Sequence, residues 1–433
     1  MRLFYIILFA LFFWCSAPWY FLNMWRRVDW RAGFGQRFGR YEPEITAALD
    51  GRPILWLHAV SVGEVGICLQ LIRVLGPRLP GFQMVVSTTT STGMGELRRR
   101  LPPSIPRFYY PVDFPRAVRR AFNTFRPKAL ILVEAEIWPN FLWQALERKA
   151  EIFLVNARLS ERSFRNYGRF GALFRPLFSQ FRAAGCQEAS DAARLTALGF
   201  APENVRIVGN LKFDAAQPEP RGGLDTRALL RQIGVSDHAK ILVTGSTHAG
   251  EEAVLAEMLA RLRQRCPELF LVLVPRHFER AREVGQQLAA RGVSFVYRSE
   301  IGHAAAGTTA APQCLLVNST GELRFFYEVA DVVFVGKSLT AKGGQNPIEP
   351  AALGKAIVLG PNMQNFTSMT RAFLAQQAVI QVPDAVALEA ALAELLASDA
   401  RRAEIGARAL AVVRKNLGAT ERTVEFLLER LAG

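Results

Sequence analysis

The strongest restriction on the fold of this chain is the regular alternation of short apolar runs with longer helical patterns. A turn-rich or polar break and then a helical pattern follow each run, which favours a parallel sheet with helices on both faces. The chain is therefore predicted to be an α/β protein with doubly wound sheets. The predicted strands cover residues 54–57, 84–87, 129–134, 151–155 and 205–208, and then 240–245, 269–274, 293–297, 314–317, 332–335 and 356–359.

A Pro/Gly-rich segment at residues 217–223 separates the two series of strands and is suited to a linker. With 433 residues, the chain is also too long for one ordinary core. We therefore predict an anchor segment at residues 1–25, a Rossmann-like domain at 26–218 and a second Rossmann-like domain at 219–433. Two such domains joined by a hinge would face a cleft, and doubly wound sheets bind ligands at the carboxyl ends of their strands.

The N-terminal segment is unusually apolar, because no charged residue occurs from Leu3 to Trp25. As a helix it would be roughly 35 Å long, enough to cross the apolar core of a bilayer. Arginines follow it closely, which predicts that the rest of the chain lies in the cytoplasm. Pro18 leaves open a helix that enters only one leaflet. No A-x-A-like cleavage site follows the run, which disfavours a removed signal peptide.

The positive charge of the chain is concentrated in its first half. The formal net charge is +15; residues 1–218 hold 29 Lys and Arg against 16 Asp and Glu, and the remainder holds 24 against 22. Such an excess predicts an anionic partner for the first half, which could be nucleic acid, phospholipid headgroups or a phosphorylated substrate. Together with the apolar N-terminus, it favours an anionic membrane surface, and no nucleic-acid partner is expected. The five cysteines form no CxxC pair, which argues against a zinc site or a disulfide framework.

Polar side chains follow the predicted strands of the first half. Glu64 comes at the start of a helical pattern, after a strand and a turn of small residues, and could cap the helix dipole or act as a general base. Thr88 and Thr89 belong to a run of hydroxyls at another helix start, which favours phosphate or sugar ligands but is also typical of helix caps. Glu136 lies directly after a strand that ends in another carboxylate, an arrangement more consistent with a site than with a solvated face.

The second half has a similar set of polar loops. The most informative is the string GGQNPIEP, in which Gly343 and Gly344 would let backbone amides approach a phosphate. Glu349 lies in the first turn of the helix that follows and could accept both hydroxyls of a ribose. Further candidates at strand ends are Ser246, His248, Arg276 and His277. The sequence contains no D-x-D motif, so a transferase that binds a metal diphosphate through that motif is disfavoured, and no metal or other cofactor is expected.

Eight strings occur in order along the chain: WLHAVSVGE, STTTSTG, EAEIWPN, VNARLS, GNLKFD, GSTHAGEE, PRH and GGQNPIEP. Together they resemble the bacterial transferases of 3-deoxy-D-manno-octulosonic acid (Kdo). The resemblance implies a fold of the GT-B type, CMP-Kdo as donor, the lipid A precursor (lipid IVA) as acceptor, and an inverting transfer without a bound metal. It implies lipopolysaccharide biosynthesis at the cytoplasmic face of a bacterial inner membrane. The chain departs from the family at Gln345, where a histidine is frequent.

The resemblance and the residues together suggest individual roles. Glu64 is the expected base, and Glu136 is expected to position Glu64 or an acceptor hydroxyl. Glu349 is expected to bind the ribose of CMP. The other predicted donor-site residues are Lys212, Ser246, His248, Arg276, His277, Gly343, Gly344 and Asn346, and the predicted acceptor or Kdo-binding residues are Ser61, Thr88, Thr89 and Arg158.

Two other functions remain open from the sequence. One is a membrane-bound GT-B transferase with another nucleotide-sugar donor, which a different nucleotide would stabilise. The other is a noncatalytic module that binds anionic lipid, which would not need carboxylates in loops at strand ends.

Overall fold

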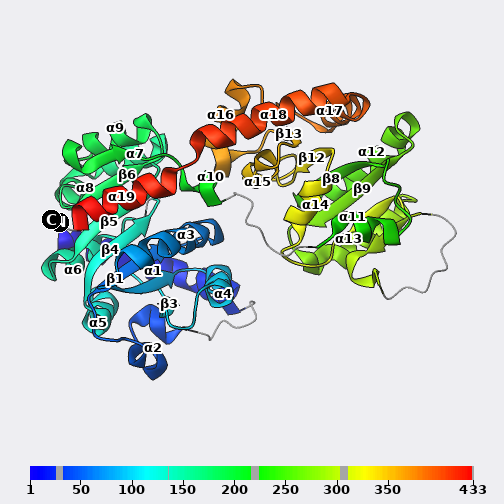
Figure 1. The fold of residues 1–433 in the computed structure, drawn as a ribbon. Helices are drawn as coiled ribbons and strands as arrows, with labels where there is room; N and C mark the ends of the chain where they lie inside the picture. Colours follow the sequence, from blue (N-terminus) through cyan, green and yellow to red (C-terminus); the bar gives the residue numbers. More distant parts are fainter. Residues whose placement is uncertain (26–32, 135, 216–223, 303–310, 432–433) are drawn as a thin grey trace. The chain divides into compact units, whose positions relative to one another are not determined.

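The computed structural model describes residues 1–25, 33–134, 136–215, 224–302 and 311–431 (Figure 1). The chain forms two compact units, and unit 1 contains both Met1–Ala215 and Leu417–Gly433, whereas unit 2 is Ala216–Asn416. This corrects the predicted second domain, 219–433, at its C-terminal end. The physical reason is that α19 (Ala419–Leu431) buries Val424, Phe426 and Leu427 in the core of unit 1.

Unit 1 is built on a parallel seven-stranded sheet with the order β3-β2-β1-β4-β5-β6-β7. In its centre, Trp56 of β1 is paired with Val85 of β2 and Leu130 of β4. The strands are β1 (Ile54–Ala59), β2 (Gln83–Thr88), β3 (Arg107–Tyr109), β4 (Pro127–Val133), β5 (Glu151–Ala157), β6 (Ala183–Cys186) and β7 (Val205–Ile207).

Apolar cores cover both faces of this sheet. Successive residues of a strand point to opposite faces, so Trp56 joins one core while Leu55 and Leu57 join the other. The helices of unit 1 besides α19 are α1 (Arg2–Trp25), α2 (Pro43–Ala47), α3 (Val62–Arg78), α4 (Ser91–Arg100), α5 (Pro115–Phe125), α6 (Pro139–Glu147), α7 (Glu161–Arg169), α8 (Gly171–Phe178), α9 (Ala189–Ala197) and α10 (Leu211–Ala215).

Unit 2 has a second parallel seven-stranded sheet, with the order β10-β11-β9-β8-β12-β13-β14. Its strands are β8 (Lys240–Thr247), β9 (Leu269–Pro275), β10 (Phe295–Tyr297), β11 (Cys314–Leu316), β12 (Val332–Val335), β13 (Ala356–Leu359) and β14 (Ile380–Gln381). Its helices are α11 (Thr226–Gln232), α12 (Glu251–Arg265), α13 (Ala281–Ala290), α14 (Leu323–Val329), α15 (Ile348–Ala352), α16 (Thr367–Ala375), α17 (Ala385–Ala397) and α18 (Asp399–Asn416).

The prediction of two doubly wound α/β units is confirmed, and every predicted strand is present. The sequence did not predict β3, β6 or β14, which are only three, four and two residues long. Such short segments carry too little periodicity to be separated from loops.

The N-terminal helix α1 packs on unit 1 along one side and exposes large apolar side chains along the other. Leu3, Phe12 and Trp14 are 70%, 68% and 71% exposed. In the part of the chain that the structure describes, no helix combines the length and the apolar character needed to cross a membrane.

Candidate active site

Both sheets have a point at which the strand order reverses. In unit 1, β2 lies on one side of β1 and β4 on the other; in unit 2, β9 and β12 lie on either side of β8. Such a point leaves a crevice outside the carboxyl ends of the two strands, where open α/β sheets bind ligands. Glu64 lies in the first turn of α3, the helix after β1, while Glu136 lies in the loop after β4 and His248 in the loop after β8. The sequence-predicted residues therefore cluster at the switch points of the two sheets.

Glu64 is a buried carboxylate whose two oxygens are both held. Ser61 Oγ donates to Glu64 Oε1 at 2.6 Å, and the Val60 amide donates to Glu64 Oε2 at 2.9 Å. Ser61 is also the N-cap of α3, because its hydroxyl accepts the Glu64 amide at 3.3 Å. Glu64 therefore takes part in the cap of α3 and also has a fixed carboxylate, because the Ser61 hydroxyl of the cap orients the Glu64 side chain.

The pKa of Glu64 is raised above the usual value of a glutamate. Burial is the largest cause, and the nearby charge of Glu134 adds to it, while Ser61, Val60 and Lys212 act in the opposite direction. When ionised, a carboxylate with a raised pKa is a stronger base than an exposed one.

Glu134 and Lys212 form an ion pair beside Glu64, with 2.5 Å between Lys212 Nζ and Glu134 Oε1. Glu134 directly follows β4 with a φ of 64°, and Asn156 Nδ2 donates to its Oε1 at 3.4 Å. Lys212 comes from α10, so the structure places this predicted donor-site residue in unit 1. Glu134 was not assigned a role from the sequence, although it precedes Glu136 in the same string.

Glu136 is the third carboxylate of this cluster. Trp138 Nε1 donates to its Oε2 at 3.0 Å. Burial raises the pKa of Glu136 to about 7, and the charges of Glu64 and Glu134 also raise it, against the effect of the Trp138 hydrogen bond. The three glutamates thus share one site, in which ionising one makes the next harder to ionise.

The predicted hydroxyl residues have unequal positions. Thr88 is buried at the end of β2, and its hydroxyl donates to the Val60 carbonyl at 3.3 Å, so it supports the loop that holds Glu64. Thr89 follows it and is half-buried. Arg158 follows β5 and lines a small cavity together with Glu134 and Tyr167, which places it near the carboxylate cluster.

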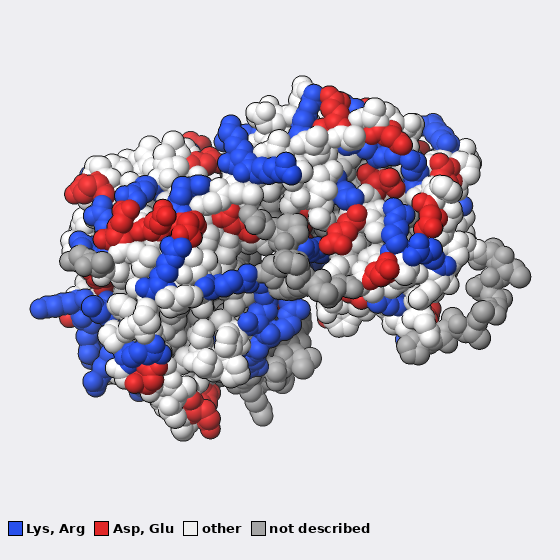
Figure 2. All heavy atoms as spheres, viewed as in Figure 1, with Lys and Arg blue, Asp and Glu red and all other residues white. Residues whose placement is uncertain are grey.

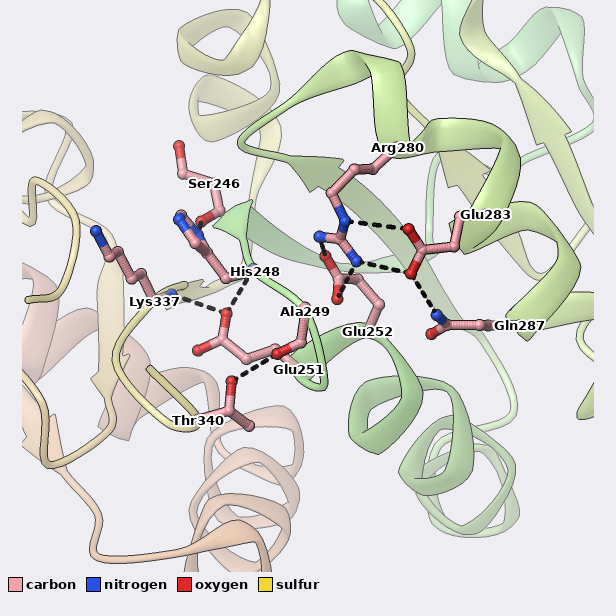
Figure 3. Close-up of polar contacts among 10 residues, drawn as sticks. All are labelled: Ser246, His248, Ala249, Glu251, Glu252, Arg280, Glu283, Gln287, Lys337 and Thr340. Atoms are coloured by element: carbon pink, nitrogen blue, oxygen red, sulfur yellow. Dashed lines mark hydrogen bonds and ion pairs between the residues drawn. The ribbon is translucent and has the colours of Figure 1, made fainter. Parts of the chain in front are cut away.

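In unit 2, a fully buried carboxylate holds two of the loops at the switch point together (Figure 3). Glu251 accepts hydrogen bonds from the amide of His248 at 2.9 Å and from those of Lys337, Ser338 and Leu339 at 2.8, 3.0 and 2.9 Å. The loop after β8 and the loop after β12 are therefore fixed by one side chain. The sequence analysis did not assign Glu251 a role, although a carboxylate in the first turn of α12 is a recognisable signal.

The charged side chains around this site come from several strand ends. Ser246 has a φ of 57° at the end of β8, and its carbonyl lies 3.3 Å from His248 Nδ1. The rings of His248 and His277 are 5.9 Å apart between centroids. Arg276 is exposed, and its amide donates to the Thr247 carbonyl at 3.0 Å. Arg276 brings a fixed positive charge to this end of the sheet.

Lys337 is a further cation that the sequence analysis missed. It directly follows Gly336 after β12 and has a φ of 56°. Burial lowers the pKa of His248, and the charge of Lys337 lowers it further, so the two side chains lie close together. The sequence signal for Lys337 as a site residue is a lysine next to a glycine at the end of an apolar strand.

The glycine-rich loop leads directly into the carboxylate that was predicted to bind ribose. Gly343 and Gly344 have φ values of 120° and 71°, which favour glycine. Asn346 Oδ1 accepts the Ile348 amide at 3.0 Å, and its Nδ2 donates to Glu349 Oε1 at 3.3 Å. Burial raises the pKa of Glu349, against the effects of Asn346, Arg324 and Arg276. Glu349 and Arg276 therefore belong to the same site.

A metal site is not evident in the part of the chain that the structure describes. There, no group of three or more His, Cys, Asp or Glu side chains could hold a metal ion. Whether the reaction proceeds without a metal stays a prediction.

Comparisons with known proteins agree with this geometry. Residues 32–215 match the family model described as 3-Deoxy-D-manno-octulosonic-acid transferase (kdotransferase). The chain is 34% identical over 426 residues to the 3-deoxy-D-manno-octulosonic acid transferase of Bordetella pertussis, covering 95% of this chain and 96% of that protein. It is 32% identical over 404 residues to the transferase of that name from Haemophilus influenzae, covering 92% and 91%.

Among solved structures, the UDP-GlcNAc 2-epimerase of Neisseria meningitidis bound to UDP-GlcNAc is similar in fold. It has a TM-score of 0.58 and 14% sequence identity, and the match covers 87% of this chain and 100% of that one. The likeness supports a two-unit α/β architecture and nothing about substrate.

The sequence relatives match along nearly their whole lengths, so the similarity extends over both units. The chain belongs to the family of 3-deoxy-D-manno-octulosonic acid transferases and is a glycosyltransferase.

Proposed function

We propose that this protein transfers Kdo from CMP-Kdo to the lipid A precursor in lipopolysaccharide biosynthesis, with inversion at the anomeric carbon. The observation that carries the proposal is the buried Glu64 carboxylate, held by Ser61 and Val60 at the switch point of unit 1 in a chain of this family.

Glu64 acts as the general base. An acceptor hydroxyl gives its proton to Glu64 while its oxygen forms a bond to the anomeric carbon of Kdo, and the bond from that carbon to the CMP phosphate oxygen breaks. CMP leaves with the electron pair of that bond. The raised pKa of Glu64 favours the proton transfer, and Glu136 in its ionised form accepts a hydrogen bond that orients the acceptor.

The nucleotide binds at the switch point of unit 2. Lys337 and Arg276 offset the negative charge on the phosphate as CMP leaves. The amides of Gly343 and Gly344 do not take this role as predicted, because they donate to Gln364 Oε1 at 2.7 Å and to the Lys337 carbonyl at 3.0 Å. Glu349 accepts the hydroxyls of the ribose, and Asn346 keeps its carboxylate oriented.

The protein works at the cytoplasmic face of a bacterial inner membrane, to which α1 attaches. The exposed apolar side chains Leu3, Phe12 and Trp14 are suited to the acyl region of a leaflet, and basic residues are suited to its anionic headgroups. Figure 2 shows Lys and Arg side chains at several places on the visible face of unit 1. Rising salt should weaken binding to anionic vesicles, because surface charges are screened over about 8 Å at physiological ionic strength.

The direct test is to incubate the purified full chain with CMP-Kdo and lipid A precursor in detergent and to measure products by mass spectrometry. The proposal expects acceptor that has gained one or more Kdo residues, together with free CMP. Transfer from a UDP-sugar instead of CMP-Kdo would show that CMP-Kdo is not the donor. Binding of anionic lipid without transfer from any donor would make the chain a binding module.

A further inference from the structure

Helix α1 lies along α6, the helix that follows the loop of Glu136. At one end, Arg2 forms an ion pair with Glu147 near the C-terminus of α6, and its guanidinium lies 5.3 Å from the ring centroid of Trp143. At the N-terminal end of α6, the ring of Phe9 contacts that of Trp138, the residue directly before this helix. The two helices are therefore antiparallel and in contact from one end of α6 to the other.

A buried aspartate joins α1 to the first amides of α6. Tyr5 donates its hydroxyl to Asp113 Oδ2 at 2.8 Å. The same carboxylate accepts the amides of Asn140 at 3.0 Å and Phe141 at 2.8 Å, which are among the unpaired donors at the N-terminus of α6. Asp113 is only 2% exposed, so this junction is part of the core rather than a surface contact.

The aromatic ring of Phe9 connects α1 to the carboxylate cluster. It packs edge-on against Trp138 with 6.4 Å between the ring centroids and against Phe114 with 5.3 Å. The indole N–H of Trp138 donates in turn to Glu136. The N–H belongs to the Trp138 ring, and Phe9 of α1 packs against that ring. The position of the N–H therefore depends on α1.

From these contacts we propose that α1 is a positioning element of the active site, which holds Trp138 so that its indole N–H fixes the Glu136 carboxylate. This inference rests on the proposed function, and it adds that the N-terminal helix sets the turnover rate as well as the attachment to lipid. Trp138 and Phe9 are positioning residues, because they act on the acceptor through Glu136.

The two faces of α1 allow the two roles to be separated. Phe9 faces α6, whereas Phe12 on the same helix is 68% exposed. Replacing either by alanine removes the same ring from the same helix. Only Phe9→Ala removes a contact with Trp138.

The first measurement is turnover on lipid A precursor dispersed in detergent, where attachment to a bilayer does not limit the rate. With saturating CMP-Kdo, kcat of Phe9→Ala should fall at least about threefold below that of Phe12→Ala, which corresponds to loss of part of a positioning interaction. In vesicles, Phe12→Ala should lose more binding than Phe9→Ala. Equal kcat of the two variants in detergent would overturn the inference.

The second measurement is the pH–rate profile of Trp138→Phe, which keeps an aromatic ring against Phe9 but removes the N–H donor. The hydrogen bond favours the ionised form of Glu136, so its loss should move the acid limb of kcat to higher pH by about one unit. An unchanged profile would also overturn the inference. The titratable groups that act on Glu136 are Glu134 of the same loop and, from other elements, Glu64, Tyr110 and Tyr167.

A readout without turnover separates this inference from the proposed function. Hydrogen exchange of the Asn140 and Phe141 amides should be faster in Phe9→Ala than in Phe12→Ala, because the junction at Asp113 is loosened. Equal exchange in the two variants would contradict the packing argument. If the parent protein transferred no Kdo, the proposed function would fail while this comparison would still decide whether α1 orders α6.

Discussion

The ammonium group of Lys212 lies 2.5 Å from a carboxylate oxygen of Glu134, and the two side chains are 20% and 22% exposed. The pair balances the cluster beside Glu64, because Glu134 raises the pKa of Glu64 while Lys212 lowers it. Neither partner is close to the other in sequence. Asn156 of β5 joins the two segments, because its Oδ1 accepts the Leu211 amide of α10 at 3.0 Å and its Nδ2 donates to Glu134 Oε1 at 3.4 Å.

Replacing Lys212 by Met should leave Glu134 without its cation and raise the pKa of Glu64 further. Because the base must be ionised, the acid limb of the pH–rate profile should move to higher pH. Stability should fall by about 1–3 kcal/mol, since a mostly buried carboxylate loses its partner. Denaturant unfolding and a pH–rate profile on one preparation measure both effects.

The matched control is the double variant with Glu134→Gln, which removes the unpaired charge. It should recover part of the stability, so that the two changes are not additive. If the two single changes added without any coupling, the pair would have no energetic role in the cluster.

Glu251→Gln should destabilise unit 2 by about 2–5 kcal/mol, because one oxygen that accepts amide hydrogens becomes an NH2 group that cannot. CMP binding should weaken as well, since the two loops that Glu251 joins surround the proposed nucleotide site. Glu257→Gln on the same helix is the control. It affects only an exposed pair with Arg291, so a loss below about 1 kcal/mol is expected. Similar melting temperatures and CMP affinities for both variants would contradict this account of Glu251.

The sequence predicted those parts of the molecule that depend on local pattern. The longer strands were predicted correctly because buried parallel strands such as β9 are apolar along their whole length. Glu64 was found because an apolar strand runs into a turn of small residues that ends with a carboxylate at the start of a helical pattern. These signals are confined to a few neighbouring residues.

The features that were missed depend on distant parts of the chain. The return of α19 to unit 1 depends on which core accepts Phe426, and its own pattern does not contain that information. The pairing of Glu134 with Lys212 and the four amides on Glu251 likewise join separate loops. In the sequence, Trp138 was noted only within the string EAEIWPN that carries the family resemblance. Its contact with Phe9 is visible only in the structure.

Glu349→Ala should weaken CMP binding much more than acceptor binding, because the carboxylate is assigned to the ribose. The expected loss is about tenfold or more, as for removal of a charged hydrogen-bond acceptor. Calorimetry with CMP alone measures this effect without the acceptor. Asn346→Asp is an informative comparison, since it removes the amide donor and adds a like charge beside Glu349. CMP affinity equal to that of the parent in Glu349→Ala would place the nucleotide elsewhere.

The most decisive substitution is Glu64→Gln. Glutamine has the shape of glutamate, and its oxygen can accept the Val60 amide while its NH2 group donates to Ser61 Oγ. The loop should therefore keep its geometry, and only the ability to accept a proton is lost. Turnover with saturating donor should fall about 10²–10⁴-fold, the range for removal of a general base. Stability should change by no more than about 1 kcal/mol, and CMP affinity should be retained, because CMP is assigned to unit 2.

Ser61→Ala supplies the reciprocal test, because it removes the N-cap of α3 and keeps the carboxylate. Its stability should fall by about 0.5–2 kcal/mol, as for loss of a serine cap. Its turnover should exceed that of Glu64→Gln by at least about tenfold, because the base is still present. If Glu64 served only as part of the cap, the two variants would have similar turnover. Both variants would then lose stability, and Glu64→Gln would transfer Kdo at nearly the parental rate, which would leave Glu136 as the next carboxylate to test as the base.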